Sequence, residues 1–181
     1  MSEIDLQERP TRRLRREKIS LPNFQADLIE RLRLAKTAQL GTTALGVQIG
    51  KTNWLIDLTE AGEILPVSAP TSVPLTQTWF KGLLNIRGEL SSVIDLNEFL
   101  GLAATPLGKE SRILSFNARL DAHAAILISR MLGLKNLLQM KPAGHEDGRG
   151  QPQFIDASEQ QWTRLSLKEL AQDPRFLQVS K

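Results

Sequence analysis

The sequence predicts a mainly β fold of the barrel type, arranged as two lobes. Short apolar segments recur along most of the chain, and Gly, Pro, Asn and Asp separate them at steady intervals, which is typical of small barrels. Two stretches of this kind flank residues 102–109, a region rich in small residues, and we expect the lobes to divide there.

The composition is that of a globular protein with a modest core. The chain has 181 residues, of which 41% are hydrophobic and 24% charged, so it fits one domain or two small lobes that share a core. The absence of cysteine excludes disulfides and thiolate metal sites. No apolar run is long enough to span a membrane, and the N-terminus lacks the apolar core of a secretion signal. We therefore expect a cytoplasmic protein.

Residues 1–22 are predicted to form a disordered basic arm. They carry few apolar side chains, and six basic residues fall within ten positions. These residues are Arg9, Arg12, Arg13, Arg15, Arg16 and Lys18. Such a run is most often a solvated tail, although it also has the charge to contact nucleic acid or anionic lipid.

Residues 23–40 are predicted to form one amphipathic helix, and residues 41–181 the β domain. Phe24, Leu28, Leu32 and Ala35 recur at helical spacing between charged residues, so they form an apolar stripe that must be buried, most simply on the body of the same domain.

The first lobe is predicted to contain five strands. Alternating or continuous apolar segments predict them at residues 45–49, 54–58, 62–67, 82–86 and 90–94. Residues 68–76 contain two prolines and several hydroxyl side chains, which predicts a loop. Asp95 is placed to cap a short helix over 96–100, and Gly101 to end it.

The second lobe is predicted from shorter signals. Apolar segments at 112–116, 122–128, 132–140, 154–157 and 162–167 indicate strands, and a terminal helix follows up to Gln172, before Pro174. Residues 141–152 hold two prolines and three glycines with mixed charge, so we expect an exposed loop there.

Little in the chain is arranged for catalysis or for binding a cofactor. A catalytic triad needs a rigidly placed histidine, and the two histidines, His123 and His145, lie in a hairpin and in the predicted loop. His145, Glu146 and Asp147 are adjacent in that loop and do not converge as metal ligands should. No glycine-rich phosphate motif is present. We expect a protein that is not an enzyme, with no cofactor and no metal.

One pair of carboxylates leaves a hydrolase as an alternative. Asp57 and Glu63 flank a predicted bend, and two carboxyl groups facing each other across a cleft can hydrolyse a glycosidic bond. No companion motif supports this interpretation.

Arg87 is the most informative single residue. It follows an apolar strand, alternating with Leu83 and Asn85, so its guanidinium is expected to be partly enclosed. A guanidinium removed from water needs an acceptor, and Glu63 is the partner we predict. Such a pair either stabilises the core or shapes a binding groove, and both roles can hold.

These residues resemble the CheW family of chemotaxis coupling proteins. The family pattern appears as Lys81-Gly82, the hairpin Asn85-Ile86-Arg87-Gly88 and Asp95-Leu96, preceded by Glu63-Ile64. The resemblance covers roughly residues 42–177 and is most specific over 54–101. Within the family, the chain is most similar to the adaptors of type IV pilus (twitching motility) chemosensory systems.

The resemblance implies both a fold and a function. The fold would be two SH3-like five-stranded β-barrels, with the N- and C-terminal segments exchanging between lobes. The function would be a non-enzymatic adaptor that links the cytoplasmic tip of a methyl-accepting chemoreceptor to the regulatory domain of a CheA-type histidine kinase. It would be recruited to receptor arrays at the inner membrane without inserting into the bilayer. The residues implied to bind partners or to shape the groove are Leu58, Ala61, Glu63, Lys81, Gly82, Asn85, Arg87 and Gly88.

The alternative from a different class is a nucleic-acid-binding β-barrel that uses the basic arm. It predicts strongly salt-dependent binding and aromatic side chains exposed on a sheet. The chain has no tyrosine and no interleaving of aromatic with basic residues, which favours the adaptor and no nucleic-acid partner.

Overall fold

The structure is a computed structural model that describes residues 42–146 and 150–181. The predicted basic arm (1–22) and amphipathic helix (23–40) lie outside these residues.

The described residues form eleven strands and several short helices, which confirms the mainly β expectation. The strands are β1 (Thr43–Ile49), β2 (Thr52–Asp57), β3 (Ala61–Pro66), β4 (Phe80–Ile86), β5 (Glu89–Ile94), β6 (Arg112–Phe116), β7 (Ala124–Ile128), β8 (Arg130–Asn136), β9 (Lys141–Glu146), β10 (Pro152–Ile155) and β11 (Gln161–Leu165). The helices are α2 (Leu96–Phe99), α3 (Leu167–Gln172) and α4 (Pro174–Leu177), with 3-10 turns η1 (Ala118–Leu120) and η2 (Leu137–Gln139).

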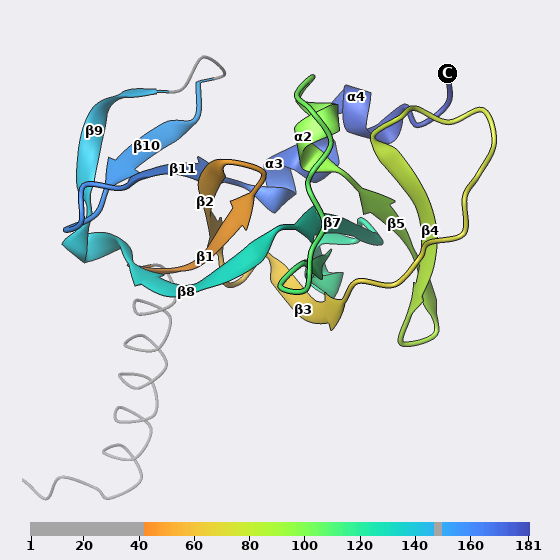
Figure 1. The fold of residues 1–181 in the computed structure, drawn as a ribbon, viewed down its shortest axis with the longest axis horizontal. Helices are drawn as coiled ribbons and strands as arrows, with labels where there is room; N and C mark the ends of the chain where they lie inside the picture. Colours follow the sequence, from red (N-terminus) through yellow and green to blue (C-terminus); the bar gives the residue numbers. More distant parts are fainter. Residues whose placement is uncertain (1–41, 147–149) are drawn as a thin grey trace, which may run out of the picture. The chain divides into compact units, whose positions relative to one another are not determined.

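The strands pair into two sheets (Figure 1). One sheet has six strands in the order β8-β1-β2-β11-β10-β9, and the other has five in the order β3-β6-β7-β5-β4. Each contains one parallel pair, β2 with β11 and β5 with β7, among antiparallel neighbours. Among the described residues, no strand pairing joins the two edges of either sheet, so the expected pair of closed five-stranded barrels is not formed by strand pairing.

The main core lies between the two sheets and the short helices. Strands of both sheets contribute buried aliphatic side chains to it, including Val47, Ile56, Ile94, Leu114 and Ile126. The helices add Leu96, Leu167 and Phe176. The ring of Phe176 stacks on Phe116 at a centroid distance of 6.0 Å and on Trp79 at 6.2 Å, so the end of the chain is packed into the core.

The five-stranded sheet has a second, smaller core on its other face. Val93, Ile113, Ala125 and Leu127 are buried there, because residues of that parity along β5, β6 and β7 point away from the main core. This small core matters for the site, since polar residues of the same face lie at one of its ends.

The chain does not pass from one sheet to the other at residues 102–109. These residues connect α2 to β6, and the strands on both sides, β5 and β6, belong to the five-stranded sheet. The crossings occur instead between β2 and β3 and between β7 and β8. The expected dividing point between lobes was therefore misplaced, because a linker composition marks a loop but does not reveal which strands pair across it.

Part of the expected loop 141–152 is a strand. Lys141–Glu146 form β9, whose residues Lys141 and Pro142 pair with Ile155 and Phe154 of β10. β9 is the edge of its sheet, where a proline without an N–H is tolerated. The proline and glycines that suggested a loop are therefore compatible with an irregular edge strand.

Asp95 caps α2 as predicted. Its Oδ1 accepts a hydrogen bond from the Asn97 N–H at 3.1 Å. The same carboxylate accepts two hydrogen bonds from Thr105, from the hydroxyl at 2.6 Å and from the backbone N–H at 2.8 Å. Asp95 is 1% exposed, so this carboxylate ties the segment after the helix to the sheet.

Candidate functional site

The hairpin between β4 and β5 explains why asparagine, arginine and glycine occur together in the sequence. Arg87 and Gly88 form its two-residue turn, and both have positive φ, +53° and +91°. This is the turn geometry that matches the twist of the flanking strands, and glycine adopts it without cost. The side-chain oxygen of Asn85 accepts a hydrogen bond from the Gly88 N–H at 2.7 Å, which fixes the turn.

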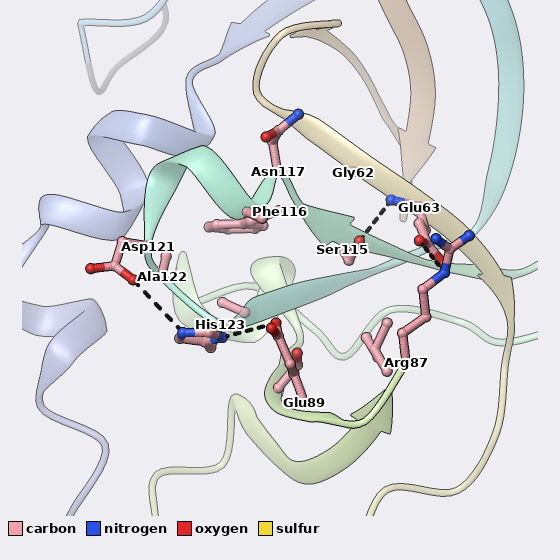
Figure 2. Close-up of a pocket in the computed structure, with 14 residues that line it drawn as sticks. Gly62, Glu63, Arg87, Glu89, Ser115, Phe116, Asn117, Asp121, Ala122 and His123 are labelled. Atoms are coloured by element: carbon pink, nitrogen blue, oxygen red, sulfur yellow. Dashed lines mark hydrogen bonds and ion pairs between the residues drawn. The ribbon is translucent and has the colours of Figure 1, made fainter.

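An ion pair joins the two edges of the five-stranded sheet. Glu63 lies on β3, at one edge, and Arg87 lies at the tip of the hairpin that contains the other edge, β4. The Arg87 Nε atom is 2.5 Å from Glu63 Oε1, so the predicted contact is present (Figure 2). We call this pair the edge clasp, because it links two strands that do not hydrogen-bond to one another.

The predicted enclosure of Arg87 is wrong. Its side chain is 80% exposed and that of Glu63 is 33% exposed. The reason is that Arg87 belongs to the turn and not to strand β4, so strand alternation does not apply to it. Ion pairs this exposed contribute little to stability. The same exposure makes the Arg87 side chain accessible to a partner.

Lys81 and Gly82 form a bulge at the start of β4. The register shifts between Phe80 and Gly82, and a Cβ atom on Gly82 would lie 2.2 Å from the Thr71 carbonyl oxygen. Gly82 therefore lets the backbone at Thr71 come close enough to exchange two hydrogen bonds with Leu83, at 2.8 and 2.9 Å. Lys81 Nζ is paired with a carboxylate of α2, Glu98, at 2.8 Å.

The turn between β2 and β3 serves the fold. Leu58 and Ala61 are partly buried and pack against the main core. Asp57 Oδ1 accepts hydrogen bonds from the N–H and hydroxyl of Thr59, at 2.8 and 2.7 Å. With Asp57 bonded within its turn and Glu63 bonded to Arg87, neither carboxylate is arranged for the paired chemistry of the hydrolase alternative.

The predicted site residues thus form three groups, one of which, Leu58 and Ala61, packs against the main core. Glu63, Asn85, Arg87 and Gly88 meet at the edge clasp, while Lys81 and Gly82 lie at the other end of β4. Sequence reasoning missed Glu60, whose carboxylate accepts a hydrogen bond from the Leu167 N–H at 2.6 Å and so holds the start of α3.

A hollow of about 390 Å³, with charged residues at its rim, opens beside the edge clasp. Glu63 and Arg87 form one part of its rim, and Glu89, Asp121 and His123 form another (Figure 2). His123 Nδ1 is 3.5 Å from Glu89 Oε2, and Nε2 is 3.7 Å from Asp121 Oδ1. The sequence placed His123 in a hairpin but carried no signal that two carboxylates would face it.

The described residues contain no group of three or more histidine, aspartate or glutamate side chains that is placed to hold a metal ion. Among the helices of this part of the chain, none is long and apolar enough to cross a bilayer.

Comparison with known proteins points to one family. A family model described as a CheW-like domain matches residues 43–173. The protein PilI of Pseudomonas aeruginosa is 31% identical over 147 residues, which cover 76% of this chain and 80% of PilI. The crystal structure of the scaffolding protein TtCheW from Thermoanaerobacter tengcongensis superposes with a TM-score of 0.59, at 16% identity, over 70% of this chain and 91% of that one.

Proposed function

The chain belongs to the family of CheW-like proteins, which act as scaffolds in chemosensory systems and are not enzymes, and from this premise we propose its specific role. It is the adaptor that couples the cytoplasmic tip of a methyl-accepting chemoreceptor to the regulatory domain of a CheA-type histidine kinase. The system it serves controls type IV pili and twitching motility. It works in the cytoplasm, at receptor arrays of the inner membrane, without entering the bilayer.

The observation that carries this proposal is the match to PilI over most of both chains. Lys81-Gly82 and Asn85-Ile86-Arg87-Gly88 carried the resemblance in the sequence. In the structure they form a bulge and a clasped hairpin whose geometry accounts for Gly82, Asn85 and Gly88. A protein that works by binding needs such a defined surface, because it transmits a state through differential contacts.

The receptor contacts are proposed for the surface around the edge clasp. Arg87, Gly88 and Asn85 are exposed there, and the strand that carries Ala61 and Glu63 forms the adjacent edge of the sheet. Three further residues support the strands that carry this surface. Leu58 packs against the main core, Lys81 pairs with Glu98 of α2, and Gly82 forms the bulge of β4.

The proposal is tested by affinity purification of the tagged full chain from cells that carry its own chemosensory system. A methyl-accepting receptor and a histidine kinase are expected to co-purify. Arg87→Ala is expected to reduce the recovered receptor several-fold, because it removes the exposed cation of the clasp. Arg164→Ala, which removes another exposed arginine, on β11, is expected to change nothing. Recovery of neither partner by the unaltered chain would overturn the proposal.

A further inference from the structure

The hollow beside the edge clasp is the open end of the small core of the five-stranded sheet. Along β5, β6 and β7, the buried residues Val93, Ile113 and Ala125 belong to that core. Ser91 lies two positions before Val93 on β5, Ser115 lies two positions after Ile113 on β6, and His123 lies two positions before Ala125; all three line the hollow. The same face of the sheet therefore changes from apolar to polar at this end.

A largely buried serine with an unpaired hydroxyl lies in the lining. Ser91 is only 6% exposed, and its side chain makes no hydrogen bond with any described residue. The neighbouring Ser115 is 7% exposed, and its Oγ accepts a hydrogen bond from the Glu63 N–H at 2.7 Å. Trp54 Nε1 is the only side-chain polar atom of the described residues that is fully buried without a partner, so the Ser91 hydroxyl is open to the hollow, where it can accept a hydrogen bond from an external group.

The charges at the rim of the hollow indicate that the external group is positively charged. Three carboxylates, those of Glu63, Glu89 and Asp121, face a single guanidinium, that of Arg87. Since Arg87 is paired with Glu63, the carboxylates of Glu89 and Asp121 have only the imidazole of His123 between them. Among the described residues, neither of these two carboxylates is paired with a guanidinium or an ammonium group, which favours a cation.

The backbone holds this rim in place. Arg87, Asp121 and His123 all have positive φ, at +53°, +51° and +37°, and all three line the hollow. Left-handed backbone at residues other than glycine is uncommon and persists where the surrounding structure enforces it.

We propose that this hollow binds a basic side chain, preferentially arginine, from a protein partner. A volume of about 390 Å³ accommodates one long side chain. A guanidinium in it has the carboxylates of Glu89 and Asp121 as acceptors and Ser91 Oγ as a further acceptor. That the partner is a protein rests on the adaptor function proposed above.

The test uses a small probe and needs no partner protein. N-acetyl-arginine methylamide is titrated into the ¹⁵N-labelled full chain, with the neutral isostere N-acetyl-citrulline methylamide as the matched probe. The arginine probe is expected to shift the amide signals of Ser91, Ser115, Asp121 and His123 in a saturable way, and citrulline is not.

Matched variants locate the charge effect. Glu89→Gln with Asp121→Asn is expected to weaken binding of the arginine probe about 5- to 10-fold, because two exposed charge contacts are lost. Glu110→Gln with Glu159→Gln removes the same net charge at exposed positions that do not line the hollow, and is expected to leave binding unchanged. Ser91→Ala is expected to weaken it about twofold, as the loss of one neutral hydrogen bond does.

Equal binding of citrulline, or equal weakening by both double variants, would overturn the proposal. Since the assay contains neither receptor nor kinase, such a failure leaves the adaptor function to its own test.

Discussion

Breaking the edge clasp should cost little stability, and the structure sets the size of that cost. The substitutions are Glu63→Gln, Arg87→Gln and the double variant; glutamine keeps the size of Glu63 and replaces Arg87 with a shorter polar side chain, and in each case the charge is removed. The contact is short, at 2.5 Å, but the Arg87 side chain is 80% exposed and water screens the pair. We therefore expect a coupling free energy of about 0.2–1 kcal/mol, as for other solvent-exposed pairs.

The assay is urea unfolding of the four proteins of the double-mutant cycle, followed by tryptophan fluorescence. The coupling energy is the difference between the loss of unfolding free energy in the double variant and the sum of the losses in the two single variants. A value within error of zero would show that the two side chains do not interact in solution. A value of about 3 kcal/mol or more would mean a buried pair, contradicting the exposure of Arg87.

The ion pair between Lys81 and Glu98 is the internal control. Its side chains are 29% and 19% exposed, so water screens it less than the edge clasp. The corresponding cycle with Lys81→Gln and Glu98→Gln is expected to give a larger coupling. The opposite order would contradict the use of exposure to rank the two pairs.

Three further predictions test the frame around the site. Gly82→Ala is expected to lower the free energy of unfolding by about 2–4 kcal/mol in urea melts, because its Cβ would meet the Thr71 carbonyl at 2.2 Å and its φ of +127° is strained for alanine; a loss under about 1 kcal/mol would contradict the close approach. Asp95→Ala is expected to cost about 3 kcal/mol in the same melts, since it removes the cap of α2 and the acceptor of two Thr105 hydrogen bonds; a neutral effect would show that this buried network is not formed. Partial burial raises the pKa of Asp156, but hydrogen bonds to its carboxylate from the surrounding residues outweigh that effect and hold the pKa below its usual value. Asp156 therefore stabilises the fold at neutral pH, and this contribution is lost as the pH falls through its folded pKa. Thermal melts of Asp156→Asn are expected to show a shallower loss of stability below pH 4 than those of the unaltered chain, and identical profiles would refute the assignment.

Local signals in the sequence predicted most elements correctly. Alternating apolar residues located the strands from β1 to β7 within a few residues, and the Asn-x-Arg-Gly pattern predicted the hairpin. Asp95 was identified as a helix cap because an acidic residue before a short apolar helix satisfies its first N–H groups. These features depend on residues close together in the chain.

The errors concern contacts between distant segments. The parallel pairing of β2 with β11 joins residues more than one hundred positions apart, and no local pattern indicates it. For the same reason, the composition of residues 102–109 indicates a connection between strands but not which sheets those strands join. β9 was missed because its proline and glycine are typical of loops, and only its position at a sheet edge makes a strand possible there.

The candidate site shows the same division. The contact between Glu63 and Arg87 was predicted, because both residues belong to the resemblance and a guanidinium needs an acceptor. The exposure of Arg87 was not predicted, since it depends on where β4 ends. The turn begins at Arg87, one residue earlier than strand alternation would require. The hollow with Ser91 and His123 arises only when β5, β6 and β7 lie side by side.

The measurement that tests the adaptor role most directly is a sedimentation assay with receptor-bearing membrane vesicles and purified kinase. If the chain couples the two, the kinase sediments with the vesicles when this protein is added and stays largely in the supernatant when it is left out. Arg164→Ala should support the same sedimentation, and Arg87→Ala should support less. Kinase that sediments equally with and without the protein would contradict the account.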